Sequence, residues 1–167
     1  GKVIAARNFC NKLWNIARYI ESTVGDGTPA KRPMPESLAD HWILGQLDAA
    51  TKQLAKQLDT YHFAEAAETI YHTVWDDVAD WFVESSKVEQ NRDMNAYVLD
   101  TILRLAHPFA PFVTETIWQS LSWHDTILAG ESWPTHHKYD AIAAAEFDRL
   151  RKLVTEARYV MSELPGN

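Results

Sequence analysis

An amphipathic segment near the start of the chain carries polar side chains that could recognise a nucleotide. At about 100° per residue its apolar residues fall on one side, which predicts a helix over Arg7–Ile20 that ends at Gly25. The opposite side holds three amides, a cation and a phenol: Asn8, Asn11, Asn15, Lys12 and Tyr19. Asparagine is a mediocre helix former, and a face that meets only water favours Glu, Lys, Gln or Arg. The set suits unstacked RNA bases and their phosphates.

The same polar strip has two other interpretations. The amides could cap or bond to a neighbouring element of this protein. The whole chain could also be a protein-docking module in which the strip meets another helix or a catalytic domain. RNA binding would weaken steeply as salt rises, whereas docking would persist without RNA.

Charge is unevenly distributed along the chain, whose net charge is −7. Residues 1–35 hold six basic and two acidic side chains, a net +4, whereas residues 36–145 hold six basic and seventeen acidic ones, a net −11. Local potential, rather than total charge, governs whether a phosphate backbone is attracted. The positive segment coincides with the polar strip, and we expect the acidic middle to be a solvated surface.

Length and composition favour one domain with a substantial core, since 46% of the 167 residues are hydrophobic. The single cysteine, Cys10, cannot form an internal disulfide, and we expect a small buried thiol there. No apolar run approaches the roughly 20 residues that span a bilayer, and the start does not resemble a signal peptide. We therefore expect a cytoplasmic protein without a membrane partner.

Turn and cap residues divide the chain into helices. Glycines and prolines between Gly25 and Pro35 predict an exposed linker, and Ser37 with Asp40 predicts the start of a second helix. Pro108 ends a helix and Pro111 begins the next. The predicted helices span about 7–24, 37–60, 63–89, 94–107, 111–121 and 140–164, with 123–139 irregular. This pattern predicts an all-α fold, an antiparallel bundle of long helices.

Two of these helices have apolar stripes that we expect to face the core. In the third helix the stripe is Phe63, Ala67, Ile70, Val74, Val78, Trp81 and Ser85. In the last helix it is Phe147, Leu150, Val154, Ala157, Met161 and Leu164. We also expect core or hinge packing for four other aromatics, Trp81, Phe109, Phe112 and Trp118.

No reaction centre is evident, so we predict no catalytic residue and no metal ligand. Asp76, Asp80 and Glu84 form a row that is typical of a solvated acidic face. His136 and His137 are expected on the surface of a loop. The spacings H-E-x-x-H, C-x-x-C and Glu-x-x-His are all absent from the sequence.

Three segments together carry a family pattern. They are Asn8-Phe9-Cys10-Asn11-Lys12-Leu13-Trp14-Asn15 with Ala17-Arg18-Tyr19, then Asp80-Trp81-Phe82-Val83-Glu84, then Leu105-Ala106-His107-Pro108-Phe109-Ala110-Pro111-Phe112-Val113-Thr114-Glu115 with Ile117-Trp118. Together they resemble the anticodon-binding helical domain of class I aminoacyl-tRNA synthetases over nearly the whole chain. The His-Pro-Phe segment is shared by the valine, isoleucine and leucine enzymes, and the first segment is most similar to the valine enzymes. The isoleucine and leucine enzymes remain the alternative.

The resemblance implies a binding role, because the family's catalytic signatures are absent. Residues 1–139 would form the anticodon-binding bundle, and residues 140–167 a C-terminal helix leading toward a further segment. The partners would be the tRNA anticodon stem-loop and the catalytic domain of the same polypeptide. No cofactor is expected in this chain; ATP and magnesium would serve the parent enzyme, which joins valine to its tRNA.

The resemblance and the residues also suggest individual roles. We expect the amides of Asn8, Asn11 and Asn15 to meet splayed anticodon bases, Lys12 to bind a base or phosphate, and Tyr19 to stack on a base. Two basic side chains, Arg7 and Arg18, would fix the RNA backbone. On the last helix, Arg158 is the one basic contact that carries over from the family, whose second arginine is replaced here by Met161.

Overall fold

The chain is helical throughout its regular structure. The structure, a computed structural model, describes residues 2–25 and 27–163. Its elements are α1 (Lys2–Val24), α2 (Leu38–Asp59), α3 (Phe63–His72), the π-helix η1 (Thr73–Phe82), α4 (Val83–Ser86), α5 (Arg92–Ala106), α6 (Pro111–Ser120), the 3₁₀ turn η2 (Leu128–Gly130) and α7 (Ala141–Glu163). No strand occurs in these ranges, so the predicted all-α fold is confirmed. None of these helices has the length and apolar character that a bilayer crossing requires.

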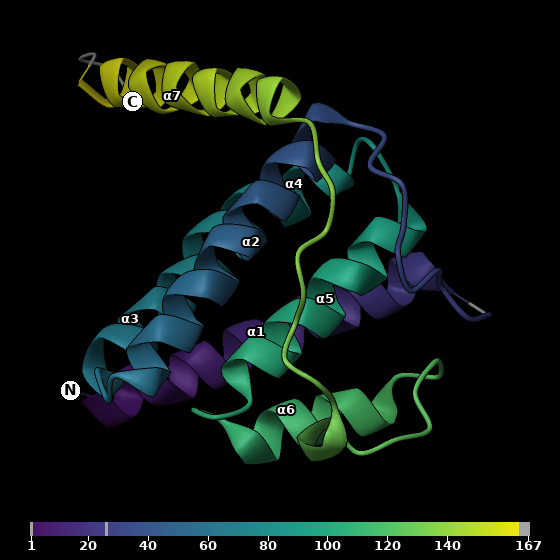
Figure 1. The fold of residues 1–167 in the computed structure, drawn as a ribbon. Helices are drawn as coiled ribbons and strands as arrows, with labels where there is room; N and C mark the ends of the chain where they lie inside the picture. Colours follow the sequence, from purple (N-terminus) through teal and green to yellow (C-terminus); the bar gives the residue numbers. More distant parts are fainter. Residues whose placement is uncertain (1, 26, 164–167) are drawn as a thin grey trace.

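Two helical layers form the bundle (Figure 1). α1 packs against α5 and α6, and α2 packs against α3 and η1, which continue one another along the chain. α2 also contacts α5, and α1 also contacts η1, so the two layers share one core. After α6, residues 131–140 form an extended strap that climbs to α7 at the opposite end of the molecule (Figure 1).

Local signals set most helix ends where the sequence predicts them. α1 ends before Gly25, whose φ of +63° lies in the left-handed region that glycine tolerates best. α2 begins after a complete capping box between Ser37 and Asp40. Pro111 occupies the first turn of α6, where its missing N–H costs no hydrogen bond.

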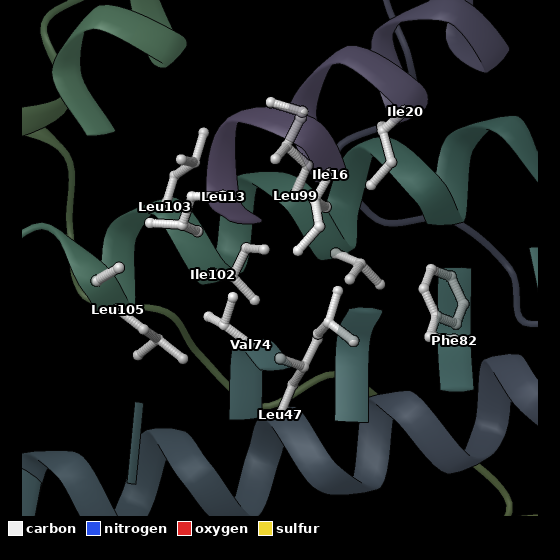
Figure 2. Close-up of a cluster of buried hydrophobic side chains, with 14 of the residues drawn as sticks. Leu13, Ile16, Ile20, Leu47, Val74, Phe82, Leu99, Ile102, Leu103 and Leu105 are labelled. Carbon is white, nitrogen blue, oxygen red and sulfur yellow. The ribbon is translucent and has the colours of Figure 1, made fainter. Parts of the chain in front are cut away.

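Apolar side chains from both layers meet in the core (Figure 2). α1 contributes a stripe that faces α5, and α2 and η1 close the other side (Figure 2). All of the labelled residues are at most 4% exposed: Leu13, Ile16, Ile20, Leu47, Val74, Phe82, Leu99, Ile102, Leu103 and Leu105. Because α1 places one whole face against this cluster, its opposite face is left toward solvent.

The third helix departs from the predicted stripe. Its middle is the π-helix η1, and one row of buried positions recurs every four residues: Ala66, Ile70, Val74, Val78, Phe82 and Ser86, with Thr73, Ala79 and Val83 also buried beside it. In an α-helix a repeat of four drifts by about 40° per step, and the wider i→i+5 turn reduces that drift. The predicted core positions Phe63 and Ala67 are therefore exposed, and Trp81 and Ser85 are only half-buried.

The last helix is also less buried than its stripe predicts. Only Phe147 of that stripe packs firmly, with its ring centroid 5.1 Å from that of Trp42 on α2. Leu150 is 50% exposed and Met161 is 59% exposed, because α7 crosses the beginning of α2 and then extends past the bundle (Figure 1). Leu164 lies outside the described residues.

Two smaller expectations were wrong. Phe112, expected in the core or hinge, is 88% exposed on the first turn of α6. His137, expected on the surface, is buried edge-on against Tyr97, whereas His136 is exposed and bonds to Asp48 at 2.9 Å. Both histidines lie on the strap, where Trp133 also donates to the Thr51 carbonyl. The strap therefore contacts α2 through Trp133 and His136 and α5 through His137.

A buried carboxylate joins the beginnings of α2 and α5. Asp40 is 2% exposed, and its Oδ2 accepts from the backbone of Glu36 at 2.9 Å and of Ser37 at 3.3 Å. The same oxygen accepts from Asn91 Nδ2 at 2.9 Å, and Asn91 Oδ1 caps α5 by accepting from the Met94 N–H at 3.1 Å. One oxygen therefore ties the linker to two helix N-termini.

We predict that Asp40→Ala lowers the free energy of unfolding by about 2 to 4 kcal/mol, because it removes a cap and leaves buried donors unpaired. Urea denaturation followed by circular dichroism measures the change. Asp59→Ala, at the exposed C-terminal end of α2, is the control and should cause no comparable loss. A variant at position 40 as stable as the wild type would contradict this role.

Candidate nucleic-acid interface

Three amides stand free on the outer face of α1. Asn8, Asn11 and Asn15 are all exposed, and none has a side-chain hydrogen bond to any residue in the described ranges. They project on the side of the helix away from Leu13 and Ile16, which are buried against α5. We call these three residues the amide ridge. Their donors and acceptors are available to a ligand without loss of an internal hydrogen bond.

Lys12 and Tyr19 lie beside the ridge, turned toward the third helix. Lys12 Nζ is 3.3 Å from Asp80 Oδ1 and 4.5 Å from the ring centroid of Trp75. The Tyr19 hydroxyl is 3.2 Å from Ser86 Oγ, and its ring is half-buried against the core. The predicted strip is therefore divided, with amides in the open and the cation and phenol partly engaged by η1 and α4. Their roles toward RNA stay predictions.

The predicted arginines lie in two places. Arg7 and Arg18 are both exposed on α1, on the flank of the ridge away from Lys12. Arg158 lies on α7, and its guanidinium is 5.6 Å from the ring centroid of Trp81 on η1. The fold therefore groups seven of the eight predicted side chains on α1, and Arg158 contacts the third helix instead.

A groove between α1 and α6 adjoins the ridge and was missed by the sequence analysis. It has a volume of about 280 Å³ and is lined by Trp14, Ala17, Arg18, Glu21, Ile117 and Ser120. Trp14 is 40% exposed, an unusual state for so large an apolar side chain. The signal for it was present, because Trp14 does not belong to the buried stripe of α1.

A larger hollow lies between α2 and the third helix, away from the ridge. It has a volume of about 450 Å³, and its lining includes Glu65, Glu68 and Asp77 with several glutamines and threonines. Burial raises the pKa of Asp77 above its ordinary value, although Arg151 Nη1 lies 3.3 Å from Asp77 Oδ1. Carboxylates in this hollow repel phosphate, so it is a poor site for RNA.

The acidic row of the third helix is divided among separate partners. Asp76 bonds to His72, Asp80 to Lys12 and Glu84 to Lys87, and all three carboxylates are exposed. Within the described part of the chain, no three His, Cys, Asp or Glu side chains gather closely enough to hold a metal ion.

Comparison with known proteins identifies the family of this chain. A model of the anticodon-binding domain of tRNA ligase matches residues 40–164. The chain belongs to this family. Within this anticodon-binding domain the match runs from the first turn of α2 through α7, whereas α1 with its amide ridge precedes the matched range.

Relatives extend the likeness of the domain to α1. The valine–tRNA ligase of Bacillus cereus (strain ATCC 10987) is 35% identical over 98% of this chain, and that of Lactiplantibacillus plantarum is 36% identical over 97%. That of Mycolicibacterium paratuberculosis is 36% identical over 96%. The chain spans about a fifth of the length of these relatives.

A solved structure supports the fold of the domain. Agrobacterium radiobacter K84 LeuRS, in a ternary complex with tRNA and LeuAMS, superposes with a TM-score of 0.65 over 79% of this chain and 16% of that one. The sequences are 22% identical, so the likeness is one of fold.

One carboxylate in the middle of α6 holds the 3₁₀ turn η2. Burial acts to raise the pKa of Glu115, but hydrogen bonds from the Leu128 N–H and from Gln119 prevail and hold it below its ordinary value of 4.5. The Leu128 N–H lies 3.1 Å from Glu115 Oε1 and the Ala129 N–H 3.3 Å from Oε2. Glu115 thereby holds η2 against α6.

We predict that Glu115→Gln lowers the thermal midpoint at neutral pH and flattens its fall in acid. A carboxyl whose folded pKa is depressed contributes fully above its unfolded pKa, near 4.5, and loses that contribution as pH falls through the folded pKa. Thermal melts from about pH 3 to 7 measure both effects. Glu146→Gln, on the exposed side of α7, should leave the pH profile as in the wild type. Identical profiles for wild type and Glu115→Gln would refute the assignment.

Proposed function

We propose that this chain is the anticodon-recognition part of a valine–tRNA ligase, with the amide ridge of α1 as its RNA contact. The observation that carries the proposal is that Asn8, Asn11 and Asn15 are exposed and have no side-chain hydrogen bond within the described ranges, on a helix whose other face is buried from Phe9 to Val24. Family membership supports the tRNA partner, and the curated relatives support valine over isoleucine or leucine.

Base recognition would combine the ridge with the charges beside it. Carboxamides donate and accept at once, so they can pair with the edges of bases that have left the stack. Arg7 and Arg18 would contact phosphates, which adds affinity that is sensitive to salt and blind to sequence. Lys12 and Tyr19 would reach RNA from the third-helix side, and Arg158 from α7.

The remaining chemistry would lie outside this chain. ATP and magnesium would serve the catalytic domain of the same polypeptide. Residues 1–139 would form the anticodon-binding unit, and 140–167 would lead toward a further segment. A cytoplasmic location follows from this role in translation. Charging assays on the full-length protein, with valine, isoleucine and leucine tRNAs, would test the specificity.

We predict that replacing Asn11 and Asn15 together by alanine weakens binding of valine tRNA by about tenfold, because two hydrogen-bonding groups are removed without loss of internal contacts. Fluorescence anisotropy with labelled tRNA, at two salt concentrations, measures the affinity. The loss should persist at both, whereas Arg18→Ala should reduce the salt dependence itself.

Gln90→Ala removes an exposed amide outside the ridge and is the matched control. Wild-type protein that binds no tRNA at low salt would reject the proposed function. Binding that the double variant leaves unchanged would reject the ridge as the contact. If the ridge instead docks against a protein, the double variant should likewise leave tRNA binding unchanged.

We predict that Asp80→Asn strengthens tRNA binding several-fold at low salt, because it removes a negative charge and releases Lys12 from its ion pair. The gain should shrink as salt rises. Asp76→Asn, one turn earlier and paired with His72, is the matched control and should give a smaller gain. Equal gains in tRNA affinity for the two variants would show only a general effect of net charge and would contradict the proposed contact between Lys12 and RNA.

A further inference from the structure

The groove between α1 and α6 presents an aromatic ring beside an unpaired cation. Trp14 and Arg18 are four residues apart and therefore neighbours on the helix surface. Within the described ranges, neither side chain makes a hydrogen bond, ion pair or ring contact with another residue. By contrast Tyr19, the aromatic that the sequence suggests for stacking, is half-buried and bonded to Ser86. Trp14 is thus the more accessible ring beside the amide ridge.

The floor and rim of this groove suit one flat polar ring. Ala17 and Ile117 are 5% and 1% exposed and form an apolar floor, and Ser120 lies exposed on the rim. At about 280 Å³ the groove is smaller than typical small-molecule pockets of about 300–1,000 Å³. A single nucleobase can stack on an indole in such a space while its phosphate remains at the rim, where Arg18 lies.

Glu21 gives the groove a preference among bases. Its side chain is exposed, lines the groove, and has no ion pair or hydrogen bond within the described ranges, although Arg18 is only three residues away. A carboxylate only accepts hydrogen bonds, so it pairs with the amino group of a base such as cytosine. Uracil presents a carbonyl oxygen at the corresponding position and would be repelled there.

We propose that the α1–α6 groove holds one unstacked base of the bound RNA, with Trp14 as the stacking surface, Arg18 on its phosphate and Glu21 selecting a base that carries an amino group. The inference rests on the proposed function and adds a specificity-determining subsite to it. The base enters beside the amide ridge, because Arg18 borders both features.

The test uses the 167-residue chain and a hairpin RNA with the sequence of the valine-tRNA anticodon stem-loop. In a matched set of hairpins, each loop base in turn is replaced by an abasic nucleotide. Trp14→Ala should weaken binding of the intact hairpin roughly 5- to 150-fold, and Trp14→Phe should retain most of the affinity because it keeps a stacking ring. At the loop position whose base enters the groove, the abasic nucleotide removes the base that stacks on Trp14. The hairpin with that replacement should therefore bind the Trp14→Ala variant and the wild type with equal affinity.

The preference of Glu21 is tested with hairpins in which that one base is changed to cytosine or uracil. Wild type should favour cytosine, and Glu21→Gln should lose this discrimination because a carboxamide can also donate to the uracil oxygen. Two matched controls should behave as wild type: Phe112→Ala removes an exposed aromatic outside the groove, and Glu68→Gln removes an exposed acid elsewhere. Circular dichroism checks that every variant is folded.

The outcomes separate the two proposals. If wild type binds no hairpin, the proposed function fails and takes the subsite with it. If the Asn11 and Asn15 variant binds weakly while Trp14→Ala and Glu21→Gln bind as wild type does, the ridge stands and the subsite is overturned. If Trp14→Ala weakens every hairpin equally, including all abasic ones, Trp14 contributes to packing and the subsite is again overturned.

Discussion

The buried Asp40 carboxylate is the constraint on which the arrangement of the helices depends. It caps α2, holds the linker that follows α1, and through Asn91 fixes the beginning of α5. Because α5 carries the apolar face against which α1 packs, the position of α1 follows from this joint. Burial of this carboxylate is tolerated because the hydrogen bonds that it accepts stabilise its negative charge and pair backbone N–H groups at the beginning of α2.

α1 shows how packing on three sides leaves one face for a ligand. Its apolar stripe meets α5, one flank meets η1 through Lys12 and α4 through Tyr19, and the other borders α6 at the groove. Among the described residues the outer face alone has no packed neighbour, and Asn8, Asn11 and Asn15 occupy it. The acidic character of the chain does not oppose this, since its carboxylates lie largely on the third helix and beyond, where several already pair with cations.

The sequence predicted the parts of this fold that short-range chemistry decides. Gly25, Ser37 and Pro111 act within a turn of their own positions, so the helix ends they mark agree with the structure. The π-helix was not predictable from a three-four spacing, because both helix types place apolar residues at similar intervals and tertiary packing decides between them. The exposure of Trp14 and Phe112 likewise depends on how far α6 reaches across α1, which no local pattern encodes.

The π-helix makes the bundle sensitive to insertions and deletions in the third helix. Loss of one residue between Thr73 and Phe82 without a change in helical winding would rotate everything after it by the turn of one residue, at most the roughly 100° of an α-helix. Asp80 and Ser86 would then leave Lys12 and Tyr19, and Trp81 would leave Arg158. Homologous chains that differ by a single residue here would thus display a different surface beside the first helix while keeping the same number of helices. A change of chain length at this one place would therefore alter which ligands can bind beside the first helix.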